Sequence, residues 1–191
     1  MRACSRLLLP LLAAALVAPG CSPRRLALTG LADALAGGSG GVFASDDDPE
    51  LIRDAAPFSL KTLEALLVEL PEHPGLLLSA CAGFAEYAYV FPQADADLVG
   101  DDDYAQVEAL RDRARRLFVR GRDYCLRALE LRRPGVGEQL LRAPEDALAW
   151  AGPADVPLLY WTGASWGGAI ALGLDRPELV ADFPAVRALL G

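Results

Sequence analysis

Histidine is almost absent from this sequence, since His73 is the single imidazole among 191 residues. This scarcity excludes most histidine-based catalysis and histidine-rich metal sites. Positive charge is also limited, because 18 Lys and Arg residues stand against 26 Asp and Glu residues, a formal net charge of −8. A general nucleic-acid binder neutralises phosphates and needs the opposite balance. Apolar residues make up 53% of the chain, which is too large a fraction for a disordered protein.

The first twenty residues have the features of an export signal. Arg2 and Arg6 form a basic start, Leu7–Val17 is a short apolar run, and small residues precede Cys21. The run is shorter than the roughly 20 apolar residues that a membrane-spanning helix needs. A small residue directly before cysteine resembles the bacterial lipobox, so we expect cleavage after Gly20 and lipidation of Cys21. The alternative is an ordinary signal peptide cut near Gly20, with Cys21 left unmodified.

Helical periodicity dominates the remainder of the chain, and no segment alternates as a strand would. The clearest pattern is a series with steps of three and four residues, which predicts one long helix: Val107, Leu110, Ala114, Leu117, Gly121, Tyr124 and Ala128. Helices are predicted over residues 24–35, 49–55, 59–70, 74–91, 104–131, 138–141, 144–149, 158–174, 177–181 and 184–190. Gly37–Gly41, Pro71 and Pro92 are assigned to breaks between them. The sequence therefore predicts an all-α fold.

Two cysteines remain for the mature fold, Cys81 and Cys125, and both lie in helical, apolar surroundings. An oxidising compartment would permit a disulfide between them, but the sequence does not test the geometry that a disulfide requires. Two buried free thiols that act as small apolar side chains are the equal alternative.

One motif matches that of a serine esterase. Gly163-Ala164-Ser165-Trp166-Gly167 fits G-x-S-x-G, which places a nucleophilic serine on a strand-to-helix turn. That chemistry needs an acid and a histidine after the serine, and no histidine follows Ser165. We therefore interpret this segment as a helix face of small residues that other backbones approach closely, and we predict no catalytic residue.

The acidic segment from Asp95 to Asp103 can be compared with a calcium-binding loop. Counted from Asp95, position five is Val99 and position twelve is Gln106, where an EF-hand needs an oxygen ligand and a glutamate. The register fails, so we predict no metal site and expect the last aspartates to cap the helix that begins at Tyr104. His73 is interpreted as a capping or surface residue.

Nine arginines lie between Arg111 and Arg133 and are offset locally by few acidic residues. Helical spacing turns them away from the apolar stripe, and we expect them to pair with acidic residues elsewhere or to face solvent. Docking of an acidic partner is the alternative. Tyr160, Trp161 and Trp166 cluster beside small residues. This cluster indicates either ordinary helix packing or the lining of an apolar ligand channel.

Several short segments carry a family resemblance. The sequence Gly121-x₃-Cys125-x₂-Ala128 before Pro134 is close to the second-helix spacing of a tetratricopeptide repeat. Five further segments stand in order along the chain: Ser45–Leu51 (SDDDPEL), Ala55–Lys61 (AAPFSLK), Phe84–Ala88 (FAEYA), Arg120–Tyr124 (RGRDY) and Leu159–Gly163 (LYWTG). Together they resemble the TatT family, the lipoprotein component associated with certain TRAP transporters, and the resemblance extends from Cys21 to the end of the chain.

The resemblance implies a bundle of cryptic tetratricopeptide helix pairs, a homo-oligomer that would be a trimer, and a channel through each protomer. It also implies association with a periplasmic substrate-binding protein that captures hydrophobic or carboxylate-bearing solutes. Neither catalytic residues nor a cofactor belong to the family pattern. We predict that Tyr87, Tyr160, Trp161 and Trp166 line the site for a hydrophobic small molecule. A generic tetratricopeptide scaffold for envelope protein–protein interactions is the alternative.

Family members continue with further helix pairs beyond the point that matches Pro184–Gly191. We therefore expect a signal peptide at residues 1–20 and a helical-repeat domain at residues 21–191 that is incomplete at its C-terminal end. The sequence as a whole predicts a non-enzymatic lipoprotein of the periplasm. It would be attached to the cell-envelope membrane through Cys21 and would have no nucleic-acid partner.

Overall fold

The computed structural model describes residues 23–99 and 103–191, and every regular element in these ranges is helical. The predicted all-α class is therefore confirmed, while the repeat character of the helix pairs stays a prediction. The predicted signal peptide, the lipidation site Cys21, and two aspartates of the acidic loop, Asp101 and Asp102, lie outside the described residues.

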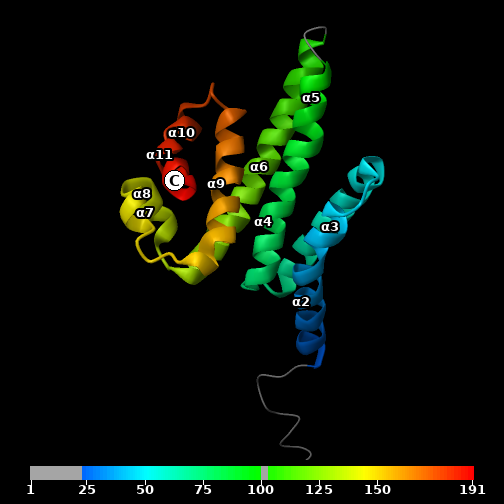
Figure 1. The fold of residues 1–191 in the computed structure, drawn as a ribbon, viewed down its shortest axis with the longest axis vertical. Helices are drawn as coiled ribbons and strands as arrows, with labels where there is room; N and C mark the ends of the chain where they lie inside the picture. Colours follow the sequence, from blue (N-terminus) through cyan, green and yellow to red (C-terminus); the bar gives the residue numbers. More distant parts are fainter. Residues whose placement is uncertain (1–22, 100–102) are drawn as a thin grey trace, which may run out of the picture.

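Five long helices form most of the fold: α2 (Pro23–Ala44), α3 (Pro49–Glu69), α4 (Pro74–Ala88), α6 (Tyr104–Arg132) and α9 (Val156–Ala171). Shorter elements are the π-helical η1 (Tyr89–Gln93), α5 (Ala94–Val99), α7 (Val136–Arg142), α8 (Pro144–Ala147), the 3₁₀ turn η3 (Pro153–Asp155), α10 (Pro177–Val180) and α11 (Phe183–Leu190). Figure 1 shows α4 and α6 side by side in the centre, with α2 and α3 on one side. Helix α9 and the short helices α7, α8, α10 and α11 lie on the other side.

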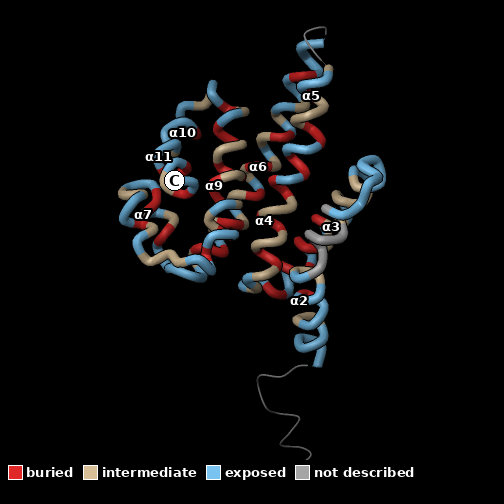
Figure 2. The backbone as a smooth tube through the Cα atoms, viewed as in Figure 1, coloured by how far each residue is buried: buried red, intermediate tan, exposed pale blue. Residues whose placement is uncertain are grey.

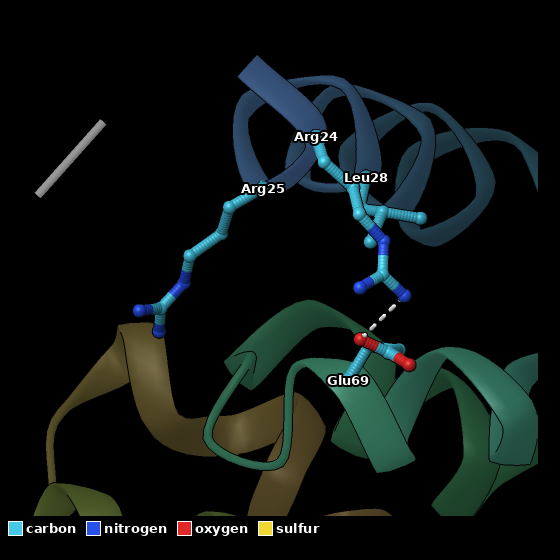
Figure 3. A pocket seen from close by; sticks show the side chains of 4 residues that line it. All are labelled: Arg24, Arg25, Leu28 and Glu69. Carbon is cyan, nitrogen blue, oxygen red and sulfur yellow. Dashed lines mark ion pairs between the residues drawn. The ribbon is translucent and has the colours of Figure 1, made fainter. Parts of the chain in front are cut away.

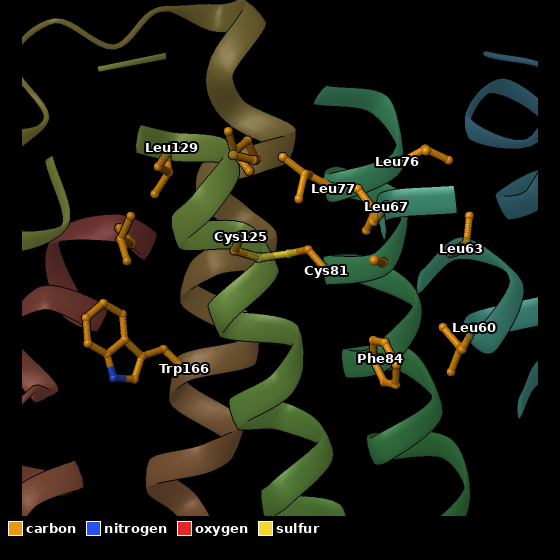
Figure 4. Packing of buried hydrophobic residues seen from close by; sticks show 14 of the residues in the cluster. Leu60, Leu63, Leu67, Leu76, Leu77, Cys81, Phe84, Cys125, Leu129 and Trp166 are labelled. Carbon is orange, nitrogen blue, oxygen red and sulfur yellow. A yellow bond between two sulfur atoms is a disulfide. The ribbon is translucent and has the colours of Figure 1, made fainter. Parts of the chain in front are cut away.

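The core lies where α4, α6 and α9 meet. Leu76 and Leu77 of α4 and Leu129 of α6 are fully buried, and Trp166 of α9 is 2% exposed. The buried segments of Figure 2 follow these central helices, whereas the outer turns of α2 and α3 are largely exposed. In Figure 4 the leucines of α3, such as Leu60, approach α4 from the side opposite to Trp166. The central pair α4 and α6 is thus covered on both flanks.

A disulfide between Cys81 of α4 and Cys125 of α6 crosses this core (Figure 4). Both cysteines are 0% exposed. Their Cα atoms are 5.1 Å apart, which is within the range that disulfides span. Gly121 and Ala128 of α6 are buried along the same contact. The structure therefore has the disulfide, one of the two alternatives that the sequence left open, and the small residues of α6 allow α4 to approach closely.

Two predicted helix breaks before α4 are wrong. Helix α2 continues through Gly37–Gly41 to Ala44, because a glycine weakens a helix by at most about 1 kcal/mol and does not forbid it. Helix α3 is a single helix with Pro57 inside it, although an interior proline costs about 3 kcal/mol. The buried leucines of the same helix, among them Leu63 and Leu67, each contribute about 1.5–3 kcal/mol. Their packing on α4 therefore outweighs the cost of Pro57.

Pro92 does not end its helix either. It lies within η1, where the wider π turn accommodates a residue without an N–H group, and the chain continues into α5. The whole stretch Pro74–Val99 is long and apolar enough to cross a membrane by length and composition, and half of its apolar window is buried inside the structure. The core helix of a globular bundle passes the same test, so this composition does not by itself assign a membrane span.

Three side chains cap the starts of helices, and the capping expected of His73 and Asp103 is confirmed. Asp48 accepts hydrogen bonds from the N–H groups of Glu50 and Leu51 at 3.1 and 3.0 Å, and so begins α3. Nδ1 of His73 accepts from the Leu76 N–H at 3.2 Å and begins α4. Asp103 caps α6 in the same way. These bonds satisfy backbone donors that have no partner inside the helix, which explains why the starts of these helices could be predicted.

Candidate functional site

A row of arginines over aromatic rings covers one side of the α3–α4–α6 layer, and we call it the arginine–aromatic face. Its arginines on α6 are Arg113, Arg120 and Arg127, spaced seven residues apart. Seven residues are nearly two helical turns, so the three side chains leave α6 along one stripe. The rings are Phe84 and Tyr87 of α4, Phe91 of η1, which follows α4 directly, and Tyr124 of α6. Arg53 of α3 completes the row.

Each guanidinium of this face lies above its own ring. The distances from guanidinium carbon to ring centre are 4.7 Å for Arg53 over Phe91, 5.9 Å for Arg113 over Tyr87, 5.0 Å for Arg120 over Phe84 and 5.4 Å for Arg127 over Tyr124. These are cation–π distances. The rings also touch one another, because Phe84 stacks on Tyr124 at 5.9 Å and Tyr87 meets Phe91 at 5.1 Å. The four arginine–ring pairs are thus joined two by two, through Phe84 with Tyr124 and through Tyr87 with Phe91.

A buried carboxylate, Glu64 of α3, ties the middle of this face together. Its Oε1 accepts a hydrogen bond from the Tyr124 hydroxyl at 2.8 Å and forms an ion pair with Arg120, and its Oε2 pairs with Lys61 at 2.6 Å. Burial by itself would raise the pKa of Glu64. The hydrogen bonds from Lys61 and Tyr124 and the charge of Arg120 outweigh burial and hold that pKa below its ordinary value.

We expect the substitution Glu64→Gln to lower the free energy of unfolding at pH 7 by about 1–2 kcal/mol, because it weakens charged hydrogen bonds. A carboxylate with a lowered folded-state pKa stabilises the fold above its unfolded pKa and loses this effect as pH falls through the folded value. The difference between wild type and variant should therefore shrink as the pH is lowered below about 4.5. Urea unfolding across this pH range measures it, and a constant difference down to pH 3 would contradict the assignment of Glu64 as the charged centre of the network.

The two ends of the row on α6 form no ion pair with a carboxylate of the described residues. Arg53 pairs with Asp95 at 2.6 Å, and the guanidinium of Arg53 holds the pKa of Asp95 below its ordinary value. By contrast, Arg113 donates to the Tyr87 hydroxyl at 3.4 Å and Arg127 donates to the Pro71 carbonyl at 2.9 Å. Neither forms an ion pair with the residues that the structure describes. Both are exposed, so their remaining donors face solvent.

The four predicted lining residues occupy separate environments. Tyr87 is 8% exposed and belongs to the arginine–aromatic face. Tyr160 is 53% exposed, and its ring meets Trp161 edge-on at 5.1 Å. Trp166 is buried on the other side of the core, where its Nε1 donates to Asp182 at 3.2 Å. The structure thus brings Tyr160 and Trp161 together and gives Tyr87 and Trp166 other contacts; ligand binding by all four stays a prediction.

Two hollows on the described surface are lined by other residues. One opens between α2 and the end of α3, where Arg24 pairs with Glu69 at 3.0 Å beside Arg25 and Leu28 (Figure 3). A second is lined by Pro71, Glu72, Leu77, Leu126, Arg127, Glu130 and Leu131. It adjoins the arginine–aromatic face through Arg127. Neither hollow is lined by Tyr87, Tyr160, Trp161 or Trp166.

Ser165 does not have the geometry of an esterase nucleophile. It lies in the interior of α9 and is 0% exposed, with its Oγ 4.0 Å from the Sγ of Cys125. A nucleophilic serine needs an exposed position on a strand-to-helix turn, whereas Ser165 faces α6. The segment is a closely packed helix face, but side chains rather than backbones approach its glycines: an added Cβ at Gly168 would lie 2.6 Å from the Phe118 ring.

Within residues 23–99 and 103–191, no group of three or more His, Cys, Asp or Glu side chains is arranged to hold a metal ion. Asp95, the first residue of the acidic segment, is engaged by Arg53. The capping role expected of the last aspartates is seen at Asp103.

The sequence prediction did not single out Arg53 and Glu64 of α3, Phe84 of α4 or Phe91 of η1 as members of one site. They lie on three successive elements, and no local pattern links them. The signal that could have indicated the face is the spacing of seven residues between Arg113, Arg120 and Arg127. The expected pairing of the arginines with acidic residues elsewhere is confirmed for Arg120 with Glu64 and for Arg132 with Asp155.

Comparison with known proteins shows the family of this chain. A family model described as the TRAP transporter T-component matches residues 45–191. An uncharacterized protein of Treponema pallidum (strain Nichols) is 32% identical over 188 residues, which cover 88% of this chain and 58% of that protein. The chain therefore spans little more than half the length of this relative.

Proposed function

Because this chain belongs to the TRAP transporter T-component family, we propose that it is a periplasmic accessory of a TRAP-type uptake system that docks the system's substrate-binding protein. The observation that carries this proposal is the match to the family over residues 45–191. The family is a transporter component and not an enzyme family, and the helical burial of Ser165 is consistent with a non-enzymatic role.

The proposal includes a position on the membrane. Cys21, which follows the basic and apolar leader, would carry the lipid anchor. Each CH₂ group of an acyl chain that enters the bilayer adds about 0.8 kcal/mol to the free energy of membrane binding. The disulfide between Cys81 and Cys125 supports an oxidising compartment. Intact-mass measurement of protein from membranes should show an acylated Cys21 as the first residue; an unmodified cysteine would contradict the anchor.

The proposed cargo is an apolar or carboxylate-bearing solute that passes to or from the docked protein. Tyr160 and Trp161 form the most accessible of the predicted aromatic contacts, whereas Tyr87 is 8% exposed. The proposal also includes the assembly of this chain into a trimer. Native mass spectrometry would report both the subunit number and any retained molecule.

Calorimetric titration of the processed protein with the substrate-binding protein of its own TRAP system tests the docking directly. We expect saturable binding at micromolar concentrations, as for other transient complexes. A substrate-binding protein from an unrelated uptake system is the matched control and should give no heat of binding. Absence of binding to both proteins would contradict the proposed function and favour a scaffold for other envelope proteins.

A further inference from the structure

The arginine–aromatic face gathers cations on one stripe of a molecule that is acidic as a whole. The chain has a formal net charge of −8, yet the face gathers Arg113, Arg120 and Arg127 on one stripe, with Lys61 alongside. Glu64 is the carboxylate that pairs with this group, and it serves both Arg120 and Lys61. The three arginines of the stripe therefore share one carboxylate in a direct ion pair, while Asp95 lies near Arg113 and Glu72 and Glu130 line the hollow beside Arg127.

The cations of this stripe are held in position before any partner arrives. Each guanidinium rests on a ring, and the rings of Phe84 and Tyr87 are 3% and 8% exposed, so they cannot move freely. A side chain that is already ordered loses less entropy when it forms a new ion pair. The side chain of Arg120 is still 46% exposed, so it stays accessible although it pairs with Glu64.

We infer that the stripe formed by Arg113, Arg120 and Arg127 is the surface on which an acidic helix of a partner protein docks. The stripe extends over about 21 Å of α6, given a rise of about 1.5 Å per residue. Such a length, with cations at regular spacing, matches a helix that presents carboxylates at the same spacing. This inference deepens the proposed function, since it names the surface and the chemistry by which the substrate-binding protein would be held.

A protein partner fits the stripe better than a small solute does. Phe84 and Tyr87, the rings under Arg120 and Arg113, are almost wholly buried, and neither of them lines the hollows between α2 and α3 or beside Arg127. Opposite charge on an extended surface orients an approaching protein and raises its association rate. The acidic remainder of this chain would at the same time repel an acidic partner from other orientations.

The test compares two variants of equal charge. The first is Arg113→Gln with Arg127→Gln, which removes the two stripe arginines that have no carboxylate partner. The control is Arg111→Gln with Arg133→Gln, which removes two arginines that also form no ion pair with the described residues but lie off the stripe of α6. Each is titrated with a fluorescent helical peptide that carries glutamates seven residues apart, and with the substrate-binding protein. We expect the stripe variant to bind both about tenfold more weakly, the control to change less than about twofold, and the effect to fade at high salt.

A variant with reversed charges distinguishes loss of the docking surface from misfolding. Arg113→Glu with Arg127→Glu should lose the glutamate peptide and gain a peptide in which lysines replace the glutamates. Equal weakening of peptide binding in the stripe and control variants would overturn the inference. Both variants are also mixed with phosphatidylglycerol vesicles. If the stripe variant loses binding to the vesicles but keeps its affinity for the peptide, the inference is likewise overturned. If the substrate-binding protein binds the wild type and the stripe variant with equal affinity, the inference fails and the proposed function stands. If the peptide binds the stripe while the substrate-binding protein does not bind at all, the inference stands and the proposed function fails.

Discussion

Replacement of both Cys81 and Cys125 by alanine is expected to lower the free energy of unfolding by about 4 kcal/mol. The two residues are separated by 44 positions in sequence, so their bond closes a long loop and limits the conformations of the unfolded chain. A protein of this size is stable by only about 5–15 kcal/mol in total. The disulfide therefore contributes a large share, and the variant should unfold at a markedly lower urea concentration.

Reduction provides the control for this experiment. Dithiothreitol should lower the stability of the wild type toward that of the double variant and leave the double variant unchanged. Peptide mapping without reductant should recover the segments that contain Cys81 and Cys125 as one linked species. If both cysteines are alkylated without prior reduction, and reductant leaves the wild-type transition in place, the bond between α4 and α6 is not formed in the protein.

The substitution Gly121→Leu is expected to cost about 3 kcal/mol, near the upper end of the usual range for overpacking. A Cβ at position 121 would lie 3.0 Å from the backbone oxygen of Cys81 and 3.2 Å from the Oγ of Ser165. These atoms belong to α4 and α9, which press on α6 from both sides. Because a backbone oxygen cannot turn aside as a side chain can, the helices would have to separate to admit leucine.

Gly30→Leu is the matched control, because Gly30 also lies inside a helix but has nothing within 4 Å of the position of its Cβ. In a helix, leucine is more favourable than glycine by about 0.8 kcal/mol. This variant should therefore be as stable as the wild type or slightly more stable. Thermal or urea unfolding of both variants measures the difference. Equal stability of the two would mean that α4, α6 and α9 are not packed as closely as described.

The parts of the fold that could be predicted depend on local chemistry. The apolar series from Val107 to Ala128 and the capping side chains of Asp48, His73 and Asp103 act within a few residues, so the sequence indicates them directly. The errors came where tertiary packing overrode local preference. Pro57 lies inside α3 because its neighbouring leucines pack on α4, and neither that packing nor the π turn at Pro92 can be inferred from the proline itself.

The candidate site was less predictable, because it depends on contacts between helices. The arginines of α6 could be placed on the polar side of the helix, but the rings below them belong mostly to α4, some thirty positions earlier in the chain. Glu64 lies sixty positions from its partner Tyr124. Likewise, Tyr87 could be predicted to be important but not to lie under Arg113. Pairings of this kind follow from the docking of α3 and α4 on α6, which periodicity does not determine.

Solute uptake is the measurement that tests the central claim most directly. Cells that lack this chain but retain the rest of its TRAP system would be supplied with a radiolabelled carboxylate that the system's substrate-binding protein retains. An accessory role predicts that uptake falls to the level of cells without the transporter, and that the wild-type chain with an intact Cys21 restores it. Unchanged uptake in the absence of the chain would contradict its assignment as a working component of the transporter.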